Sequence, residues 1–201
     1  MMFRYPKELL MLITLLKKLG GVGQTTAERY AFQLLNWEDK DLKILGDTIA
    51  ELKIKINFCS ICGCIMENNH CFFCDDPTRN KNIICIISSP KEAYAIEQTK
   101  SFNGLYHVIT HLISPLVGLE ETGLNLNQLL RRIKNNSTIK EIIIALDSTL
   151  EGDATSLHLK KELAPFSLTI SRLAFGIPMG SPLEYIDKGT LTQALCGRQL
   201  F

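Results

Sequence analysis

The sequence has no long uncharged hydrophobic run and no surplus of charge of either sign. Its longest uncharged stretch, residues 104–119, contains two histidines, a proline and two glycines, so it is too short and too broken to span a bilayer. The 22 basic and 21 acidic side chains leave a net charge of +1. The overall electrostatic field of the protein is therefore too weak to attract it to nucleic acid or to an anionic membrane. Any binding site for a polyanion must therefore be local.

The sequence also lacks a recognisable export signal. Arg4 and Lys7 precede the apolar run 9–16 as in a secretory leader, but Lys17 and Lys18 end that run and no small-residue cleavage site follows. We interpret the run as part of a helix and expect a cytoplasmic protein.

The 201 residues, 46% of them apolar, suffice for real hydrophobic cores, and the first region is helical in pattern. Apolar residues at helical spacing predict three helices, over 6–19, 25–36 and 39–56. Pro6 suits a first helical turn, and Asp39 suits the positive end of a helix dipole. Either Thr25 or Thr26 can cap the second helix. We expect a helical module over 1–56.

From residue 82 onward, apolar β-rich runs alternate with helical ones. The pattern predicts strands over 83–87, 105–110, 142–146 and 168–174, and helices over 90–99, 124–135 and 154–163. Continuous apolar strands between helices indicate a parallel sheet covered on both faces. We expect an α/β domain over 79–175. The tail, 176–201, reads as a Gly/Pro-rich loop followed by a strand and a helix that pack against or swap with another subunit.

Four of the seven cysteines form two pairs, Cys59-x-x-Cys62 and Cys71-x-x-Cys74. Each pair makes a chelating corner, and two corners close a tetrahedral thiolate shell typical of structural zinc, with no open position for catalysis. Without an export signal, disulfides are disfavoured, and a thioredoxin-type centre uses only one such pair. The segment 57–78 is too short and too polar to be held by burial, so a metal would stabilise it.

The other cysteines have less specific interpretations. Cys64 and His70 are near enough to serve as substitute ligands, although His70 also reads as a surface loop residue. Cys85 lies in an apolar run and is interpreted as a small buried hydrophobic residue.

Three glycines lie within the five residues 19–23, Leu-Gly-Gly-Val-Gly, between the first two expected helices. Such a tight turn directs consecutive backbone N–H groups outward, and with the following helix N-terminus it can hold a phosphate oxygen. Lys17, Lys18 and Arg29 flank it, and residues 1–35 carry five basic and two acidic side chains. An ordinary corner between helices is the alternative. A nucleotide P-loop fits worse, because Gln24 stands where that motif requires lysine.

Carboxylates follow the strand expected over 142–146. Asp147, Glu151 and Asp153 lie at the carboxyl end of a parallel strand, where such sheets bind ligands, and Asp147 with Glu151 could approach one magnesium ion. Alternatively, Glu151 and Asp153 simply favour the positive N-terminus of the next helix.

Residues 19–29 resemble a helix-hairpin-helix DNA-binding element. They match its pattern at Gly21, Val22, Gly23, Ala27 and Arg29 and depart from it at Gly20, Gln24 and Thr25. The order of this hairpin and a four-cysteine finger resembles the bacterial RecR family of recombination mediators. The tail also resembles that family, in a part called Walker-B-like; no Walker A lysine accompanies it, so we expect no ATP hydrolysis.

Residues 84–174 resemble a Toprim domain, the fold shared by topoisomerases, primases and some nucleases. Its magnesium site takes a glutamate after the first strand and an Asp-x-Asp-x-Glu-Gly set after a later one. Here Ser88 and Thr149 replace two of the four carboxylates. The resemblance therefore implies a Toprim scaffold without phosphoryl-transfer activity, and the protein is not expected to be an enzyme.

The resemblance implies that the protein is a recombination mediator in DNA repair and that it binds single- and double-stranded DNA without sequence preference. The implied DNA contacts are Lys17, Lys18, Gly21, Val22, Gly23 and Arg29. The implied partners are RecO, with RecF as a second candidate, in loading the strand-exchange recombinase onto DNA coated by single-strand-binding protein. A ring-like homotetramer is implied, with Asp147, Glu151 and Asp153 contacting a partner. The alternatives are a magnesium-dependent Toprim nuclease or topoisomerase-like enzyme using the same acids, and a zinc-stabilised adaptor without DNA contact.

Overall fold

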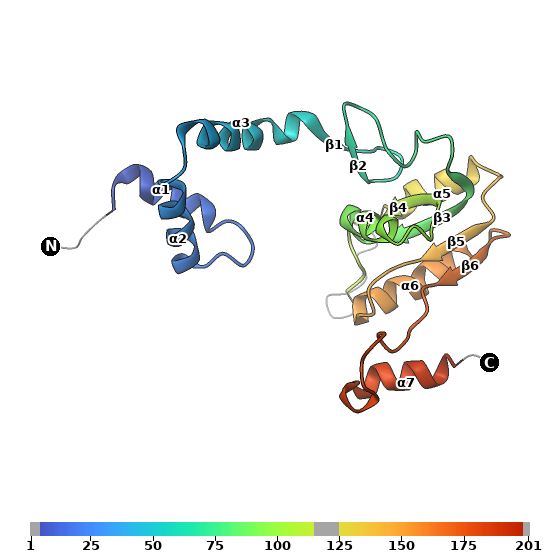
Figure 1. Cartoon of the computed structure of the whole chain (residues 1–201). Helices are drawn as coiled ribbons and strands as arrows, with labels where there is room; N and C mark the ends of the chain where they lie inside the picture. The colour runs from blue at the N-terminus through green and yellow to red at the C-terminus, as the bar shows by residue number, and fades with distance from the viewer. Residues whose placement is uncertain (1–4, 115–124, 199–201) are drawn as a thin grey trace. The chain divides into compact units, whose positions relative to one another are not determined.

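The computed structural model describes residues 5–114 and 125–198, and the chain divides into two compact units (Figure 1). Unit 1 is Met1–Lys55 and unit 2 is Ile56–Phe201. None of the helices among the described residues is both long and apolar enough to cross a membrane.

Unit 1 consists of three helices, α1 (Lys7–Leu16), α2 (Gln24–Leu34) and α3 (Asp39–Lys55). The first two pack through Leu9 and Ile13 of α1 and the fully buried Ala27 and Ala31 of α2. Alanine at both α2 positions lets the helices approach closely, which holds the turn between them in place. No residue of α3 is buried.

The start of α2 differs from the sequence prediction. Neither Thr25 nor Thr26 caps it: Gly23 is the N-cap residue, in an extended conformation, and the helix begins at Gln24. Gly21 has φ +78°, a left-handed conformation that glycine adopts without strain, and it completes the turn early enough for both threonines to be helical.

Unit 2 begins with a small antiparallel ribbon of β1 (Ile56–Phe58) and β2 (Ile65–Glu67). The main sheet follows, with its elements in the order β3 (Asn80–Ile87), α4 (Pro90–Gln98), β4 (Gly104–Val108), α5 (Leu126–Lys134), β5 (Glu141–Ile144), α6 (Leu150–Leu163) and β6 (Thr169–Arg172). Its four strands are all parallel and lie in the spatial order β4-β3-β5-β6. The predicted α/β class and parallel sheet are confirmed.

The two faces of the sheet form separate cores, because alternate residues of each strand point to opposite faces. Ile84 and Ile86 of β3 face a core completed by α5 and α6. Cys85 and Ile87 face the other core, which contains Ala93 of α4 and the cysteine segment. Burial raises the pKa of the Cys85 thiol to about 12, which agrees with its interpretation as a buried apolar residue.

Two further differences from the predictions have a local cause in the structure. Helix α6 begins at Leu150 instead of Ala154, because Thr149 caps it. In the tail, residues 176–198 contain the 3-10 helix η2 (Leu183–Tyr185) and α7 (Lys188–Cys196) but not the expected strand. Pro182 precedes η2 as its N-cap residue. The predicted start of the fifth helix, at residue 124, lies outside the described residues.

Candidate metal centre and nucleic-acid interface

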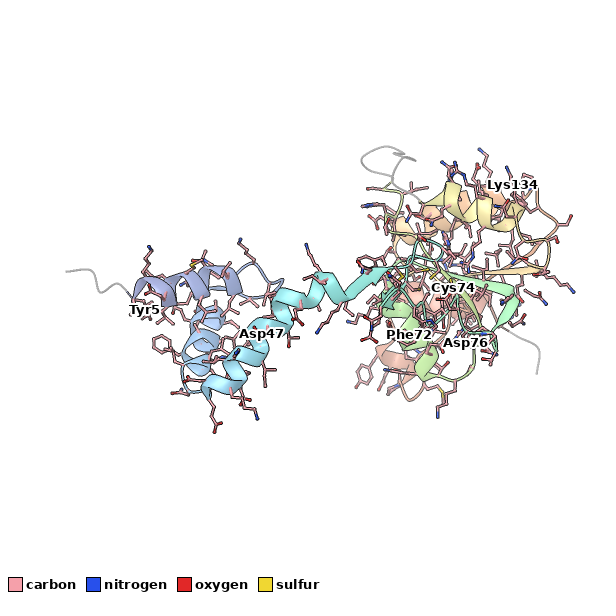
Figure 2. The ribbon with its side chains drawn as sticks, turned by 90° about the horizontal axis from the view of Figure 1, so that it is seen from above. Tyr5, Asp47, Phe72, Cys74, Asp76 and Lys134 are labelled. Carbon is pink, nitrogen blue, oxygen red and sulfur yellow. The ribbon has the colours of Figure 1, made fainter. Side chains whose placement is uncertain are left out.

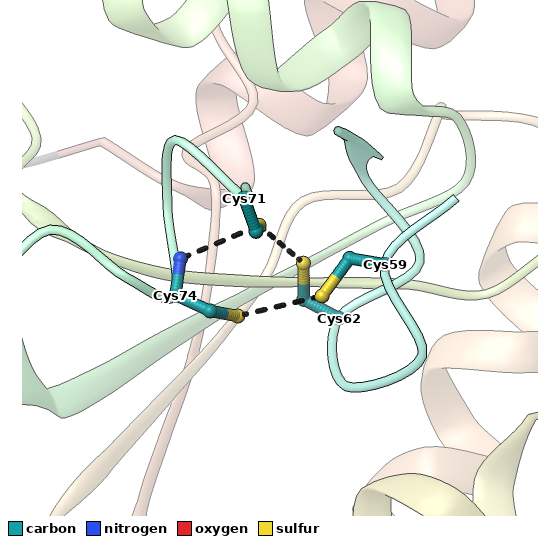
Figure 3. A group of neighbouring side chains, drawn as sticks. All are labelled: Cys59, Cys62, Cys71 and Cys74. Atoms are coloured by element: carbon teal, nitrogen blue, oxygen red, sulfur yellow. Dashed lines mark hydrogen bonds between the residues drawn. The ribbon is translucent and has the colours of Figure 1, made fainter. Parts of the chain in front are cut away.

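The four paired cysteines meet in one cluster (Figure 3). The sulfur atoms of Cys59, Cys62, Cys71 and Cys74 all lie within 4.8 Å of one another. Sγ of Cys62 is 3.6 Å from that of Cys71, and Sγ of Cys59 is 4.0 Å from that of Cys74. Among the described residues this is the only group of three or more side chains of metal-binding type.

Backbone N–H groups point at the sulfur atoms, as they do where thiolates are stabilised. The N–H groups of Ile61, Cys64 and Cys74 donate to Sγ of Cys59, Cys62 and Cys71, each at 3.4 Å. Gly63 has φ +76° and turns the chain between the first cysteine pair and β2. The local fold therefore forms the two chelating corners predicted from the spacing.

The electrostatics of the cluster call for a cation. The pKa of the Cys62 thiol is raised by the hydrogen bond of Cys62 with Cys64, together with burial. The pKa of the Cys74 thiol is raised by the hydrogen bond of Cys74 with Cys62 and, to a smaller extent, by burial. Four crowded thiols do not ionise together in the absence of a positive charge, whereas a bound metal ion favours all four thiolates. The four cysteines can thus hold a metal ion.

The two side chains considered as substitute ligands lie outside the cluster. Cys64 is fully buried next to Cys62, but it is not a member of the four-sulfur group. His70 is exposed, with Nδ1 3.5 Å from the carboxylate of Asp75.

The cysteine segment is joined to the main sheet by several contacts. The Val108 N–H of β4 donates to the Cys62 carbonyl at 2.8 Å. A Cβ added at Gly63 would lie 2.9 Å from Cβ of Val108, so only glycine allows this approach without a shift. Arg79, the buried residue that follows the segment, lies with its guanidinium 5.2 Å from the ring centre of Phe73 within it; it donates to the Gly104 carbonyl at 2.8 Å and forms an ion pair of 2.5 Å with Glu97 of α4. The finger and the edge strand β4 therefore form one packed structure.

The glycine-rich turn in unit 1 connects α1 to α2. Val22 is half-buried against the α1–α2 core, and its N–H donates to the Leu19 carbonyl at 3.1 Å, which anchors the turn. Gly23 has no side chain to cap the first N–H groups of α2, so these groups are available to an oxygen of a ligand.

The charged residues predicted to accompany the turn are all exposed, namely Lys17, Lys18 and Arg29. One contact beside them was not predicted from the sequence, and it involves one of the two acidic side chains counted over residues 1–35. Glu28 lies in the first turns of α2 and its carboxylate accepts a hydrogen bond of 2.5 Å from Nε2 of Gln24. The helical spacing of four residues between Gln24 and Glu28 is the signal that would have indicated this contact.

The acidic residues after β5 lie around the start of α6. Asp147 is exposed, while Glu151 and Asp153 lie in the first turn of α6. Asp153 forms an ion pair of 2.5 Å with Arg172 of β6. The structure thus brings a cation to Asp153, and among the described residues the three acids do not meet in a group that could hold a metal ion.

The two replaced carboxylate positions both contribute to helix starts. Oγ1 of Thr149 accepts a hydrogen bond of 3.0 Å from the Gly152 N–H and caps α6. The Ser88 hydroxyl donates to Glu92 at 2.6 Å, next to the capping box of α4. A Cβ at Gly152 would collide with the Asp147 carbonyl oxygen, which explains why glycine follows Glu151.

Comparison with known proteins matches three segments of the chain to family models. The chain matches the family described as "RecR, helix-hairpin-helix" over residues 10–53, "Toprim domain" over 82–174 and "RecR, C-terminal" over 176–199. It is 50% identical over 198 residues to the "Recombination protein RecR" of Protochlamydia amoebophila (strain UWE25), covering 98% of this chain and 100% of that protein. The protein of the same name from Chlamydia pneumoniae is 43% identical, with 100% of both chains covered. That of Bifidobacterium adolescentis is 40% identical, with 94% of both covered.

Proposed function

Because the chain belongs to the RecR family of recombination proteins, and so has a role in DNA recombination and repair, we propose that it is a mediator that binds DNA without sequence preference. In this proposal it acts with RecO, and with RecF as a second candidate, to load the strand-exchange recombinase onto single strands coated by single-strand-binding protein. It carries out no phosphoryl transfer and works in the cytoplasm.

The observation that carries the DNA-binding proposal is the α1–α2 hairpin. Its turn presents uncapped N–H groups at the start of α2, and exposed Lys17, Lys18 and Arg29 flank it. Backbone N–H groups and the lysine and arginine side chains bind phosphate oxygens and do not read base edges, so a hairpin of this kind binds DNA of any sequence. Gly21, Val22 and Gly23 shape the turn, and the proposed domain 1–56 contains all six contact residues.

A salt titration tests the hairpin. The Lys17→Ala, Lys18→Ala, Arg29→Ala triple variant should bind single- and double-stranded DNA more weakly. Each phosphate contact that is lost should reduce the slope of log affinity against log salt by about one. Glu28→Gln is the matched variant of opposite sign, since it removes a negative charge from the start of α2, next to the turn, and should strengthen binding. Unchanged affinity and slope in the triple variant would favour the adaptor without DNA contact.

We also propose that the four-cysteine cluster, in a finger spanning 57–78, holds one structural zinc ion. Four thiolates form a closed tetrahedral shell that suits zinc and leaves no position for a substrate or a reactive water. The N–H groups directed at the sulfur atoms and the coupling to β4 support a metal that stabilises the fold. Metal analysis should therefore give one zinc per chain.

For the Toprim-like domain, 79–175, we propose partner binding in place of chemistry. Exposed Asp147, with Glu151 and Asp153, offers negative charge to a basic partner surface. The competing function is a magnesium-dependent nuclease or topoisomerase-like enzyme that uses these three acids. Two observations weigh against it: Arg172 pairs with Asp153, and Thr149 serves as a helix cap. Phosphoryl transfer needs carboxylates that are free to bind the metal ion.

Assembly into a ring-like homotetramer completes the proposal, with the tail, 176–201, contributing to contacts between subunits. A ring would let a protein of net charge +1 retain DNA by topology with modest charge on its inner surface. Helix α3 supports an oligomer, because it has no buried residue and leaves Ile49 and Ile54 exposed.

A further inference from the structure

Two adjacent arginines in the last turn of α5 have different environments. Arg131 is exposed, whereas Arg132 is half-buried between the sheet and the finger. Nη1 of Arg132 donates to the Tyr106 carbonyl of β4 at 2.6 Å, and Nη2 lies 3.8 Å from Sγ of Cys74. Figure 2 shows Cys74 within the body of unit 2, while Lys134, the last residue of α5, lies at its periphery. Arg132 therefore connects the sheet to the sulfur cluster.

Cys74 is the most accessible part of that cluster. It is half-buried, whereas Cys59, Cys62 and Cys71 are buried. A cavity of about 440 Å³ reaches Cys74 and Arg132 and is also lined by Ser60, Ile61 and Gln128. Gln128, one turn before Arg132, donates to the Ser60 carbonyl and holds the finger loop at the cavity edge. Water or a chelator can thus approach the cluster through this cavity, beside the guanidinium of Arg132.

The charge of a loaded cluster gives Arg132 a role. Four thiolates with one divalent metal ion carry a net charge of −2, and removing that charge from water is costly unless cations and hydrogen-bond donors face it. Arg132 supplies both at Cys74.

We propose that Arg132 retains the metal ion: it donates a charge-assisted hydrogen bond to the Cys74 thiolate, covers that sulfur on the cavity side and ties the centre to β4. It acts on the metal only through Cys74 and is therefore a positioning residue. The inference rests on the proposed metal site and is independent of DNA binding.

The test is the rate at which the zinc-loaded full-length protein transfers its metal to an excess of a chromophoric chelator. Arg132→Gln should release the metal about 10- to 100-fold faster, the usual effect of losing an outer-shell partner. Arg131→Gln, the matched change at the adjacent exposed position, should release it at the wild-type rate. Arg132→Lys keeps the charge but cannot make both contacts, so it should be intermediate.

A second readout separates metal retention from a purely structural role. In the cobalt-substituted protein, Arg132→Gln should shift the thiolate-to-cobalt charge-transfer absorption, because a hydrogen bond to one ligand sulfur is lost. A residue that only packs the sheet would lower thermal stability but leave the release rate and this absorption unchanged.

The outcomes are distinct. Equal release rates for Arg132→Gln and Arg131→Gln would overturn the role of Arg132 while leaving the metal site intact. A wild-type chain that binds no metal would overturn the site itself and this role with it. If Arg132→Gln does not fold, Arg132→Lys decides: faster release than wild type supports the proposal, and an unchanged rate contradicts it.

Discussion

At the scale of single residues, the buried side chain of His107 is the least satisfied in unit 2. It is 1% exposed in β4, and neither ring nitrogen has a hydrogen-bond partner among the described residues. Burial, and then the charge of Arg132, lower its pKa to about 4, so the imidazole is neutral at physiological pH. A buried polar group without hydrogen bonds destabilises the folded state. For His107 this destabilisation increases in acid, because the unfolded chain can protonate the imidazole more readily than the folded chain.

His107 should make the folded protein sensitive to mild acid. The unfolded chain takes up a proton below the ordinary histidine pKa of about 6.5, whereas the folded chain does so only near pH 4, so stability falls as the pH drops through this window. Denaturant titrations measure how far the unfolding free energy falls between pH 7 and pH 5.5. This fall should be about 1 kcal/mol smaller in His107→Leu than in the wild-type protein.

Exposed His111 provides the control for that measurement. His111→Gln should keep the wild-type loss of stability between the two pH values. If His107→Leu also keeps it, the buried imidazole is not the group responsible.

At the scale of elements, the finger depends on what it is attached to. Strands β1 and β2 have three residues each, and Phe58 is 68% exposed, so this ribbon buries too little apolar surface to fold alone. The Cys62–Val108 hydrogen bond attaches it to β4, and the proposed metal ion in the sulfur cluster would stabilise it further.

Removing the metal should therefore destabilise more than the finger. Cys71→Ser, or treatment with a chelator, should release the segment from β4 and lower the unfolding free energy by roughly 2–5 kcal/mol, as for loss of a structural cross-link. Cys64→Ser is the matched control, because Cys64 is equally buried but outside the four-sulfur group; it should still bind one metal per chain. A Cys71→Ser chain with wild-type metal content and stability would contradict this account.

Features set by residues close together in the sequence could be predicted, whereas contacts between residues far apart in the sequence could not. The cysteine pairs are local, and their spacing predicted both corners. The parallel sheet followed from apolar runs between helices, and the family resemblance is confirmed. The contact of Arg132 with Cys74 joins residues 58 positions apart, and no pattern in the sequence indicates it.

Local errors had local causes. Thr25 and Thr26 are good capping residues, but the conformation of Gly21 starts α2 before them. The strand expected in the tail is not found in 176–198, where Pro182 is the N-cap residue of the 3-10 helix η2. The DNA-contact residues and the domain boundaries stay predictions.

At the scale of the whole molecule, unit 1 leaves large apolar side chains of α3 exposed. On α3, Ile49 is 65% and Ile54 is 77% exposed. Surface of this kind is typical of contacts between subunits.

Native mass spectrometry should find an assembly of four times the 22.6 kDa of one chain under the conditions in which DNA is bound. Ile49→Glu should shift the population to smaller species, because burying a carboxylate in an apolar contact is unfavourable. Lys43→Glu changes charge at another exposed position of α3 and should keep the wild-type mass. A monomer at all concentrations, with and without DNA, would contradict the ring.

In the proposed function, the Toprim scaffold holds DNA and leaves its phosphodiester bonds intact. Incubation of the purified protein and magnesium with end-labelled linear and supercoiled circular DNA, followed by analysis of DNA length and linking number, decides between this mediator and a Toprim enzyme. We expect the DNA to be recovered uncut and with its linking number unchanged. Cleavage or strand passage that Glu151→Gln abolishes would instead identify an enzyme.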